Sequence, residues 1–234
     1  MQSRNFRSER KFFINNTQLE LLKRRIMPIM HLDEHTGGKG YYNVRSLYFD
    51  DFHNSCFYEK EDGTDPREKY RIRVYDGSAE YISFECKRKE RGKTLKKSCI
   101  ISEDQAKSLI GGCSNTITED QAPLLRRFAI LMRTAGFHPV CIVNYDRIPY
   151  TFTAGNVRVT IDTHISASSD VDAFWEGIPA CRPVMPTGMH LMEVKYDDFI
   201  PDLIARSLDL GQLQETACSK YYLCRKYSFM RGGR

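Results

Sequence analysis

The stretch YRIRVYD, residues 70–76, places Arg71 and Arg73 on either side of Ile72, with Val74 next in the chain. Side chains at positions i and i+2 of a β-strand point to the same face of the sheet. The stretch therefore predicts a strand with one charged face and one apolar face. The apolar face needs a core to cover it, and the charged face needs water or a ligand of opposite charge.

The same alternation recurs in four further segments, RSERK (7–11), FECKRK (84–89), VRVTID (157–162) and LMEVKYD (191–197). A single strand of this kind most often has a solvated outer face. Repetition, with apolar residues between the charges, favours charged faces that meet around a shared polar space. The candidate inward side chains are Arg7, Glu9, Lys11, Arg45, Arg71, Arg73, Glu85, Lys87, Arg147, Arg158, Asp162, Glu193 and Lys195.

The charge and shape of these side chains indicate which ligand such a space can hold. Charges buried without partners are costly, so the space must be wet or filled by an anion. The planar fork of arginine suits bidentate contact with phosphate oxygens, and lysine supplies a point charge. A polyphosphate is the ligand that needs many cations in a row. Its charge would also recruit a hard divalent ion, for which Glu193 is the natural carboxylate ligand.

Propensity and turn signals predict one α+β domain over residues 1–234. About eight mostly antiparallel strands with one wet face each can close into a barrel. A helical insertion is expected at about residues 102–136. The expected strands are residues 6–14, 42–49, 69–75, 81–89, 93–101, 140–153, 157–165 and 189–196. The expected helices are residues 17–30 (capped by Asn16 or Thr17), one capped by Ser102, residues 123–134, one from Pro201 and residues 215–226, with 50–66 and 166–188 as loops.

Composition excludes several classes of protein. The chain has 234 residues, is 41% hydrophobic and 28% charged, and has a formal net charge of +5, which is typical of a soluble globular protein. It has neither a long apolar run nor a secretory signal, so we expect no transmembrane segment. Its eight cysteines form no CxxC pair, and the GxxxxGK[ST] loop of P-loop proteins is absent.

The basic run KRKERGKTLKK, residues 87–97, leaves three interpretations open. It can be a patch for nucleic acid or anionic lipid. It can be a solvated hairpin. It can also place lysines at the mouth of a tunnel, where they would steer anions inward.

The motifs RSERKFF, SLYFDD, YRIRVYD, FECKRK, VNYDR, VRVTID, LMEVKYD and CSKYYLCRKY follow one another over residues 7–227. In this order they resemble the VTC domain, the catalytic domain of polyphosphate polymerases, within the CYTH-like superfamily of triphosphate tunnel metalloenzymes. The resemblance implies an eight-stranded antiparallel β-barrel, the triphosphate tunnel, with flanking helices. It also implies transfer of the γ-phosphate of ATP onto a growing inorganic polyphosphate chain, with Mn²⁺ or Mg²⁺.

The resemblance also implies site residues. Catalytic contacts to the triphosphate fall on Arg71, Arg73, Arg147, Arg158 and Lys195, and the metal ligand is Glu193. Substrate-binding positions fall on Lys11, Lys87, Tyr145, Ser219 and Lys220. A further tunnel lysine falls on Lys96 or Lys97, a register that the sequence leaves open.

One motif of this chain departs from the superfamily pattern, and the difference bears on the choice between a polymerase and a hydrolase. Superfamily hydrolases usually begin with Glu-x-Glu-x-Lys, whereas this chain has Arg7-Ser-Glu9-Arg-Lys11. Loss of the first glutamate favours a polymerase over a metal-dependent triphosphatase, and a non-catalytic polyphosphate-binding module is the third alternative. The expected partners are ATP and inorganic polyphosphate, with no nucleic acid. The expected location is cytoplasmic, with membrane association only through a partner protein.

Overall fold

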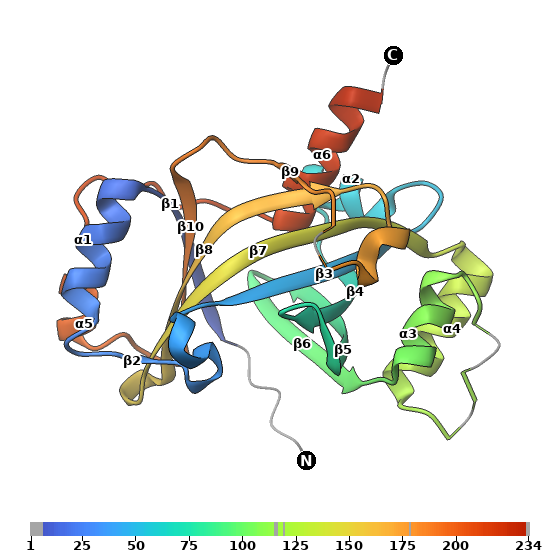
Figure 1. Cartoon of the computed structure of the whole chain (residues 1–234), viewed down its shortest axis with the longest axis horizontal. Coiled ribbons are helices and arrows are strands. Elements are labelled where there is room, and N and C mark those ends of the chain that lie inside the picture. Colours follow the sequence, from blue (N-terminus) through green and yellow to red (C-terminus); the bar gives the residue numbers. More distant parts are fainter. Residues whose placement is uncertain (1–6, 115–116, 119, 178, 233–234) are drawn as a thin grey trace.

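The protein is built around one antiparallel sheet, seen in a computed structural model that describes residues 7–114, 117–118, 120–177 and 179–232 (Figure 1). The main strands follow one another in the order β1-β10-β8-β7-β3-β4-β5-β6. Two short strands extend the sheet, β2 beside β7 and β9 beside β8. The strands are β1 (Ser8–Asn15), β2 (His31–Leu32), β3 (Tyr42–Asp50), β4 (Arg67–Tyr75), β5 (Ser78–Glu90), β6 (Lys93–Ile100), β7 (His138–Phe152), β8 (Val157–Ser168), β9 (Arg182–Pro183) and β10 (Met189–Tyr196).

The sheet curls until its two edge strands meet. In the described part of the chain, one isolated bridge joins the two edges, between Arg7, which directly precedes β1, and Thr94 of β6. The predicted α+β class and the eight-stranded antiparallel sheet are confirmed, and the β1–β6 seam is the weakest point of its closure. Phe6, where the sequence places the start of the first strand, lies outside the described residues.

Two pairs of helices cover the apolar face of the sheet, one at each end (Figure 1). Leu22 of α1 packs with Val159 and Ile161 of β8, and Ile204 of α5 completes this cluster. At the other end, Phe128 of α4 packs with residues of β4 and β5. Burial of this face leaves the charged face of each strand pointing the other way. These helices are α1 (Asn16–Ile26), α3 (Glu103–Ile110), α4 (Pro123–Ala135) and α5 (Asp202–Ser207).

Two further helices, α2 (Ser55–Glu61) and α6 (Lys220–Gly232), pack where the charged faces meet. Tyr221 of α6 lies against Tyr48 of β3, with ring centroids 5.1 Å apart. Its hydroxyl donates a short hydrogen bond to the buried Asp50. Asp50 also accepts hydrogen bonds from the backbone N–H groups of Cys56 and Phe57 at the start of α2. One carboxylate therefore holds both helices to the end of β3.

The structure changes some of the predicted boundaries. Residues 50–66 are not a loop throughout, because they contain α2. Asn15, not Asn16 or Thr17, caps α1, and its side chain accepts from the backbone N–H of Gln18. The last helix begins at Lys220 rather than at residue 215. None of the described helices has both the length and the apolar composition to cross a membrane.

Candidate functional site

The charged faces of the strands enclose a cavity of about 100 Å³, here called the inner cavity. Eight of its lining residues are lysine or arginine, and one is a carboxylate. The alternation read from the sequence explains this, because each strand contributes every second side chain to the same space. The lining residues are Lys11, Tyr48, Lys69, Arg71, Arg73, Lys87, Tyr145, Arg147, Glu193, Lys195, Ser219 and Lys220.

Glu193 on β10 is the carboxylate of the inner cavity, and its residue is 5% exposed. Its Oε1 lies 2.6 Å from Nζ of Lys195. Burial alone would raise the pKa of Glu193, but the ammonium groups of Lys195, Lys11, Lys220 and Lys87 hold it well below its ordinary value. Glu193 is therefore charged at neutral pH, despite being buried.

Two arginines of the inner cavity are oriented by carboxylates. Arg71 donates from Nε to Oε2 of Glu85 at 2.7 Å, and from Nη1 to the hydroxyl of Tyr48 at 2.7 Å. Arg147 donates from Nε to Oδ1 of Asp162 at 2.7 Å and from Nη2 to Oδ2 at 2.8 Å. Arg147 is held on the side of Nε and Nη2, whereas each of the three guanidinium nitrogens of Arg71 has a protein partner. Both guanidinium groups are therefore fixed in orientation before an anion binds.

The supporting carboxylates are themselves held in the charged form. Burial would raise the pKa of Glu85, but Arg71 and Arg73 hold it well below its ordinary value. The pKa of Asp162 is likewise lowered despite burial, by Arg147 and by Lys220, whose Nζ lies 2.5 Å from Oδ2. These charges offset part of the positive charge of the inner cavity.

Arg73 is less tightly held than Arg71. Its Nε donates to Oγ of Ser46 at 3.2 Å, and its Nη1 lies 3.8 Å from Glu85. Its Nη2 contacts the hydroxyl of Tyr145 at 3.4 Å. Tyr145 in turn lies beside two other cations, with Nζ of Lys220 4.8 Å from its ring centroid. Arg73 and Tyr145 thus present polar groups to the same part of the inner cavity.

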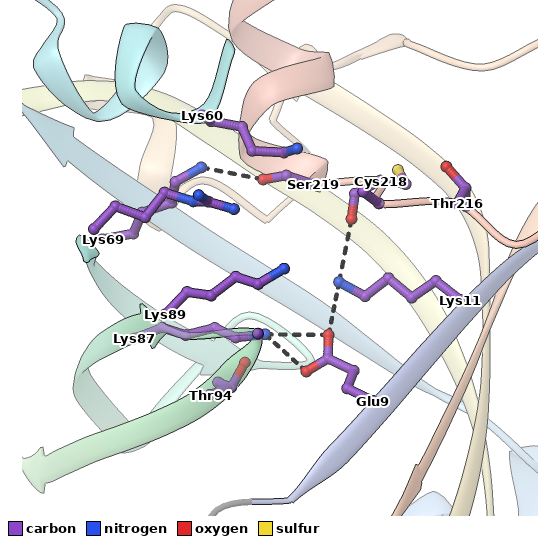
Figure 2. Close-up of a pocket in the computed structure, with 13 residues that line it drawn as sticks. Glu9, Lys11, Lys60, Lys69, Lys87, Lys89, Thr94, Thr216, Cys218 and Ser219 are labelled. Carbon is purple, nitrogen blue, oxygen red and sulfur yellow. Dashed lines mark hydrogen bonds and ion pairs between the residues drawn. The ribbon is translucent and has the colours of Figure 1, made fainter. Parts of the chain in front are cut away.

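A second cavity of about 130 Å³, here called the vestibule, adjoins the inner cavity. The two share Lys11, Lys69, Lys87 and Ser219 in their linings. Figure 2 shows the lysine side chains converging on the vestibule from β1, α2, β4 and β5. Glu9 is the carboxylate of its described lining, and it is bound by Lys11 at 2.7 Å and Lys87 at 3.0 Å.

A family model described as the VTC domain matches residues 6–229. The chain belongs to the VTC domain family. Solved structures with the same fold include a putative adenylyl cyclase, HpAC1 from Hippeastrum, described as having a dominant triphosphatase activity. It is 12% identical, the match covers 95% of each chain, and the TM-score is 0.56. A putative adenylate cyclase from Bacillus halodurans is 13% identical over 90% of this chain and 93% of its own, with a TM-score of 0.50. No curated protein matches this VTC domain in sequence.

The resemblance to triphosphate tunnel metalloenzymes implies a divalent metal, which the residues of this VTC domain would have to hold. Its described residues contain no group of three or more His, Cys, Asp or Glu side chains placed to ligate a metal. Mg²⁺ commonly binds to one or two carboxylates together with substrate phosphates and water. Glu193, a charged carboxylate inside a phosphate-sized basic cavity, fits that kind of shared site.

Most of the residues proposed from sequence lie in the inner cavity of the VTC domain, but three do not. Lys97 faces outward beside Cys86, whereas Lys96 pairs with Lys87 across the strands and places Nζ 3.0 Å from Glu85. Of the two alternatives that the sequence left open, the structure therefore places Lys96, and not Lys97, on the tunnel side. Lys96 lies on the tunnel side, although it is not among the lining residues of either cavity. Arg158 is also absent from both linings, because it is held by Asp33 at 2.9 Å and by the Tyr42 hydroxyl at 3.0 Å.

Two further inward candidates have structural partners elsewhere. Arg45 points to the opposite face of β3, where its guanidinium donates to the carbonyls of Phe174 and Gly177 at 2.8 and 3.0 Å. Arg7 pairs with Asp197 at 2.8 Å. Arg45 is therefore wrong as a tunnel residue, and Arg7 is not among the lining residues of either cavity. Their charge is used to tie a loop or a strand end to the sheet.

Lys69 is a cavity residue that sequence reasoning missed. Its Nζ donates to Oγ of Ser219 at 3.2 Å and lies 4.6 Å from the ring centroid of Tyr221. Burial lowers its pKa to about 7, and the nearby cations Arg67 and Lys60 act in the same direction. A signal for it was present, since Lys69 precedes Arg71 by two positions and shares its face.

Proposed function

We propose that this VTC domain is a polyphosphate polymerase that transfers the γ-phosphate of ATP onto a growing inorganic polyphosphate chain, with Mn²⁺ or Mg²⁺. The observation that carries the proposal is one charged, buried carboxylate, Glu193, in a cavity lined by eight cations. Phosphoryl transfer depends on positioning and on neutralising charge, with little covalent chemistry for the protein to perform. The inner cavity supplies both.

The reaction assigns roles to the lining. Arg71, Arg73 and Arg147 hold the triphosphate, and Lys195 holds Glu193 in place. A terminal phosphate oxygen of the polymer, or of a priming phosphate, attacks the γ-phosphorus of ATP. The bond from that phosphorus to the β–γ bridging oxygen breaks, and ADP leaves with the electron pair. A divalent ion held by Glu193 would neutralise charge developing on the leaving group. Lys11, Lys87, Tyr145, Ser219 and Lys220 contact the phosphates of the polymer in this proposal.

Arg158 is proposed to contact the triphosphate only after its present partners release it. Its guanidinium is occupied by Asp33 and Tyr42, so a contact with the nucleotide requires that pairing to open. Lys96 is proposed to act through Glu85, which it contacts at 3.0 Å, and so to help orient Arg71. The whole chain acts as one tunnel domain in this view, with residues of about 102–136 as a helical insertion. Cytoplasmic location and a membrane-protein partner stay predictions.

A metal-dependent triphosphatase is the second candidate, and the activity described for the Hippeastrum protein favours it. Two observations on this chain favour the polymerase. Glu9 is the remaining carboxylate of the RSERK motif, and two lysines already bind it. A second carboxylate free to place a metal-bound water is thus missing from the described inner lining.

Purified protein incubated with ATP and Mn²⁺ distinguishes the candidates. A polymerase gives a ladder of polyphosphate on a gel, together with ADP. A triphosphatase gives free phosphate without polymer, and that result would overturn the polymerase proposal. Glu193→Gln serves as the inactive variant, and Glu80→Gln, which removes an exposed carboxylate, is its matched control.

A further inference from the structure

Arg158 stands at a tunnel-facing position of β8, although its side chain lines neither cavity. The register of β8 with β10 places Arg158 directly opposite Lys195. Residues paired in this way point to the same face of an antiparallel sheet, with Cβ atoms about 5 Å apart. Since Lys195 lines the inner cavity, the side chain of Arg158 leaves the sheet on the tunnel face.

The two cations of this pair are directed apart. Like charges directly opposite each other in a sheet repel. Lys195 places its Nζ 2.6 Å from Oε1 of Glu193, inside the inner cavity. Arg158 instead donates from Nη2 to Oδ2 of Asp33 at 2.9 Å and to the hydroxyl of Tyr42 at 3.0 Å. Its guanidinium therefore lies outside the inner cavity because these partners hold it there, and not because its strand faces elsewhere.

Asp33 is held in place independently of Arg158. It directly follows β2, and its backbone N–H donates to the carbonyl of Pro149 in β7 at 3.0 Å. Its Oδ1 accepts from the backbone N–H of His35 at 3.1 Å and lies 2.7 Å from Nδ1 of the same residue. The first of these contacts caps the short 3-10 helix η1 (Glu34–Lys39). Since Arg158 binds the other oxygen, Oδ2, the loop keeps these hydrogen bonds when Arg158 leaves.

The pair between Asp33 and Arg158 is of a kind that a phosphate can displace. The side chain of Arg158 is 35% exposed, and ion pairs that water reaches contribute little net free energy. Burial would raise the pKa of Asp33, but hydrogen bonds from His35 and the charge of Arg158 hold it below its ordinary value. Asp33 is therefore charged at neutral pH, as a phosphate is. Phosphate groups offer the same planar fork more oxygens and more charge than one carboxylate does.

Asp33 differs in this respect from the carboxylates beside the other tunnel arginines. Glu85 and Asp162 bind Arg71 and Arg147 while both of these arginines line the inner cavity. Those two carboxylates orient a guanidinium that is already in the site. Asp33 binds its arginine at a place from which the guanidinium does not reach the lining.

We propose that Asp33 is an internal competitor of the phosphate ligand, which holds Arg158 away from the empty inner cavity and releases it when a triphosphate binds. The inference rests on the proposed function, because it takes the inner cavity as the site of the triphosphate. Only the released orientation of Arg158 contacts phosphate, so the pairing lowers the apparent affinity for the ligand. Asp33 is thus a positioning residue that acts through Arg158.

Calorimetric titration of tripolyphosphate into the full chain, in the absence of metal, tests the inference without relying on turnover. The variants are Asp33→Asn, Arg158→Gln and the two combined. Asparagine keeps the size of the aspartate side chain and can still cap η1. The matched control is Glu215→Gln, which breaks the pair with Arg10, another arginine–carboxylate pair at 2.9 Å. Neither residue of that pair lines a cavity of the tunnel.

We expect Asp33→Asn to bind tripolyphosphate about fivefold more tightly than the wild type, and Arg158→Gln to bind it about tenfold more weakly. In the Arg158→Gln background, Asp33→Asn should change the affinity by less than about twofold, because the arginine that it holds is gone. Tyr42→Phe, which removes the second partner of Arg158, should tighten binding by about twofold. Glu215→Gln should bind as the wild type does.

A gain in affinity is a result that damage to the fold would not produce. Weaker or unchanged binding by Asp33→Asn would mean that Asp33 does not compete with the ligand, and would overturn the inference. A gain of equal size without Arg158, or in the Glu215→Gln control, would show removal of charge alone and overturn it too. If Asp33→Asn does not fold, weaker or unchanged binding by Tyr42→Phe overturns it.

Three further outcomes separate this inference from the proposed function. If wild-type protein fails to bind tripolyphosphate, the inner cavity is not a triphosphate site, and both proposals fall. If tripolyphosphate binds equally well to Arg158→Gln, Arg158 does not reach the ligand, and only the inference about Asp33 falls. If the affinities follow the expected pattern but ATP yields no polymer, the inference holds and the proposed polymerase falls.

Discussion

Replacement of Glu193 by glutamine should change turnover and anion binding in opposite directions. The amide would keep the size of the side chain and a contact to Lys195, but it would lack the charge that holds a divalent ion beside the phosphates. We expect the rate of polymer formation to fall about 100-fold or more, roughly 2.7 kcal/mol of transition-state stabilisation. The same change removes the negative charge of the inner lining, so tripolyphosphate should bind more tightly when metal is absent.

The size of the second effect follows from Coulomb's law. Two unit charges about 4 Å apart interact by about 4 kcal/mol at an effective dielectric constant of about 20. Water and the lysines around Glu193 screen this repulsion. We therefore expect about a third of it, roughly 1.4 kcal/mol or a tenfold gain in affinity.

Two assays check the prediction. Gel analysis of products with ATP and Mn²⁺ measures the rate, and calorimetry with tripolyphosphate and a chelator measures the affinity. Glu80→Gln, with its carboxylate on the surface, should alter neither. Polymer formation at a near wild-type rate would refute the assignment of Glu193 as the metal ligand. Weaker metal-free binding of tripolyphosphate by the variant would refute the electrostatic reasoning. It would mean that the substitution damages the cavity, which lowers both the rate of polymer formation and the affinity for the anion.

Three other measurements address the cations. Arg71→Ala and Arg73→Ala should each weaken tripolyphosphate binding by about 1.5–3 kcal/mol in calorimetry; Arg71→Ala should also lower thermal stability, because Glu85 loses its closest partner. Normal binding by both variants would contradict the tunnel arrangement. Polyphosphate at one hundred times its Kd should raise the free energy of unfolding by about 2.7 kcal/mol, and so raise the melting temperature. Longer chains should be more effective, and added salt should weaken the effect. An equal shift from sulfate at matched ionic strength would point to diffuse charge. Because burial lowers the pKa of Lys69 to about 7 and a bound anion would raise it, polyphosphate binding should take up a proton and weaken as pH rises above about 7. Without ligand the sign for folding is opposite, since the unfolded state binds the proton more tightly and stability rises with pH above about 7. Lys69→Arg should flatten the binding profile, and an unchanged profile would show that the phosphates alone titrate.

Local sequence signals were sufficient for most of the sheet. Alternating charged and apolar residues identified the strands and their wet faces, and the turn at Asp76-Gly77 placed the β4–β5 hairpin. Both facts depend only on residues a few positions apart, so they can be read before the chain is folded. The same holds for α3, where Ser102 and Gln105 form the capping box that the sequence predicts.

Where sequence reasoning failed, a distant partner decided the outcome. The side chain of Arg45 lies on the face of β3 opposite to the cavity, because the carbonyl groups of residues 174–177 lie there and accept from its guanidinium. The short helix α2 has seven residues, about two turns, which is too short for a clear apolar stripe. The carboxylate of Asp50 in the preceding strand accepts from the backbone N–H groups of Cys56 and Phe57 in its first turn. The choice between Lys96 and Lys97 depended on the pairing of β6 with β5.

The sequence by itself determined that several strands carry cations on one face, and hence that the protein needs an anion or water at its centre. It could not determine which cations are neutralised, because that depends on which carboxylates the curled sheet brings within a few ångströms. The tertiary structure pairs Arg71 with Glu85 and Arg147 with Asp162. It also gathers Lys60, Lys69 and Lys89 from separate elements and leaves them without ion pairs in the described part of the chain. Charge at one position is local, but its compensation is set by distance in space, and only the fold sets those distances.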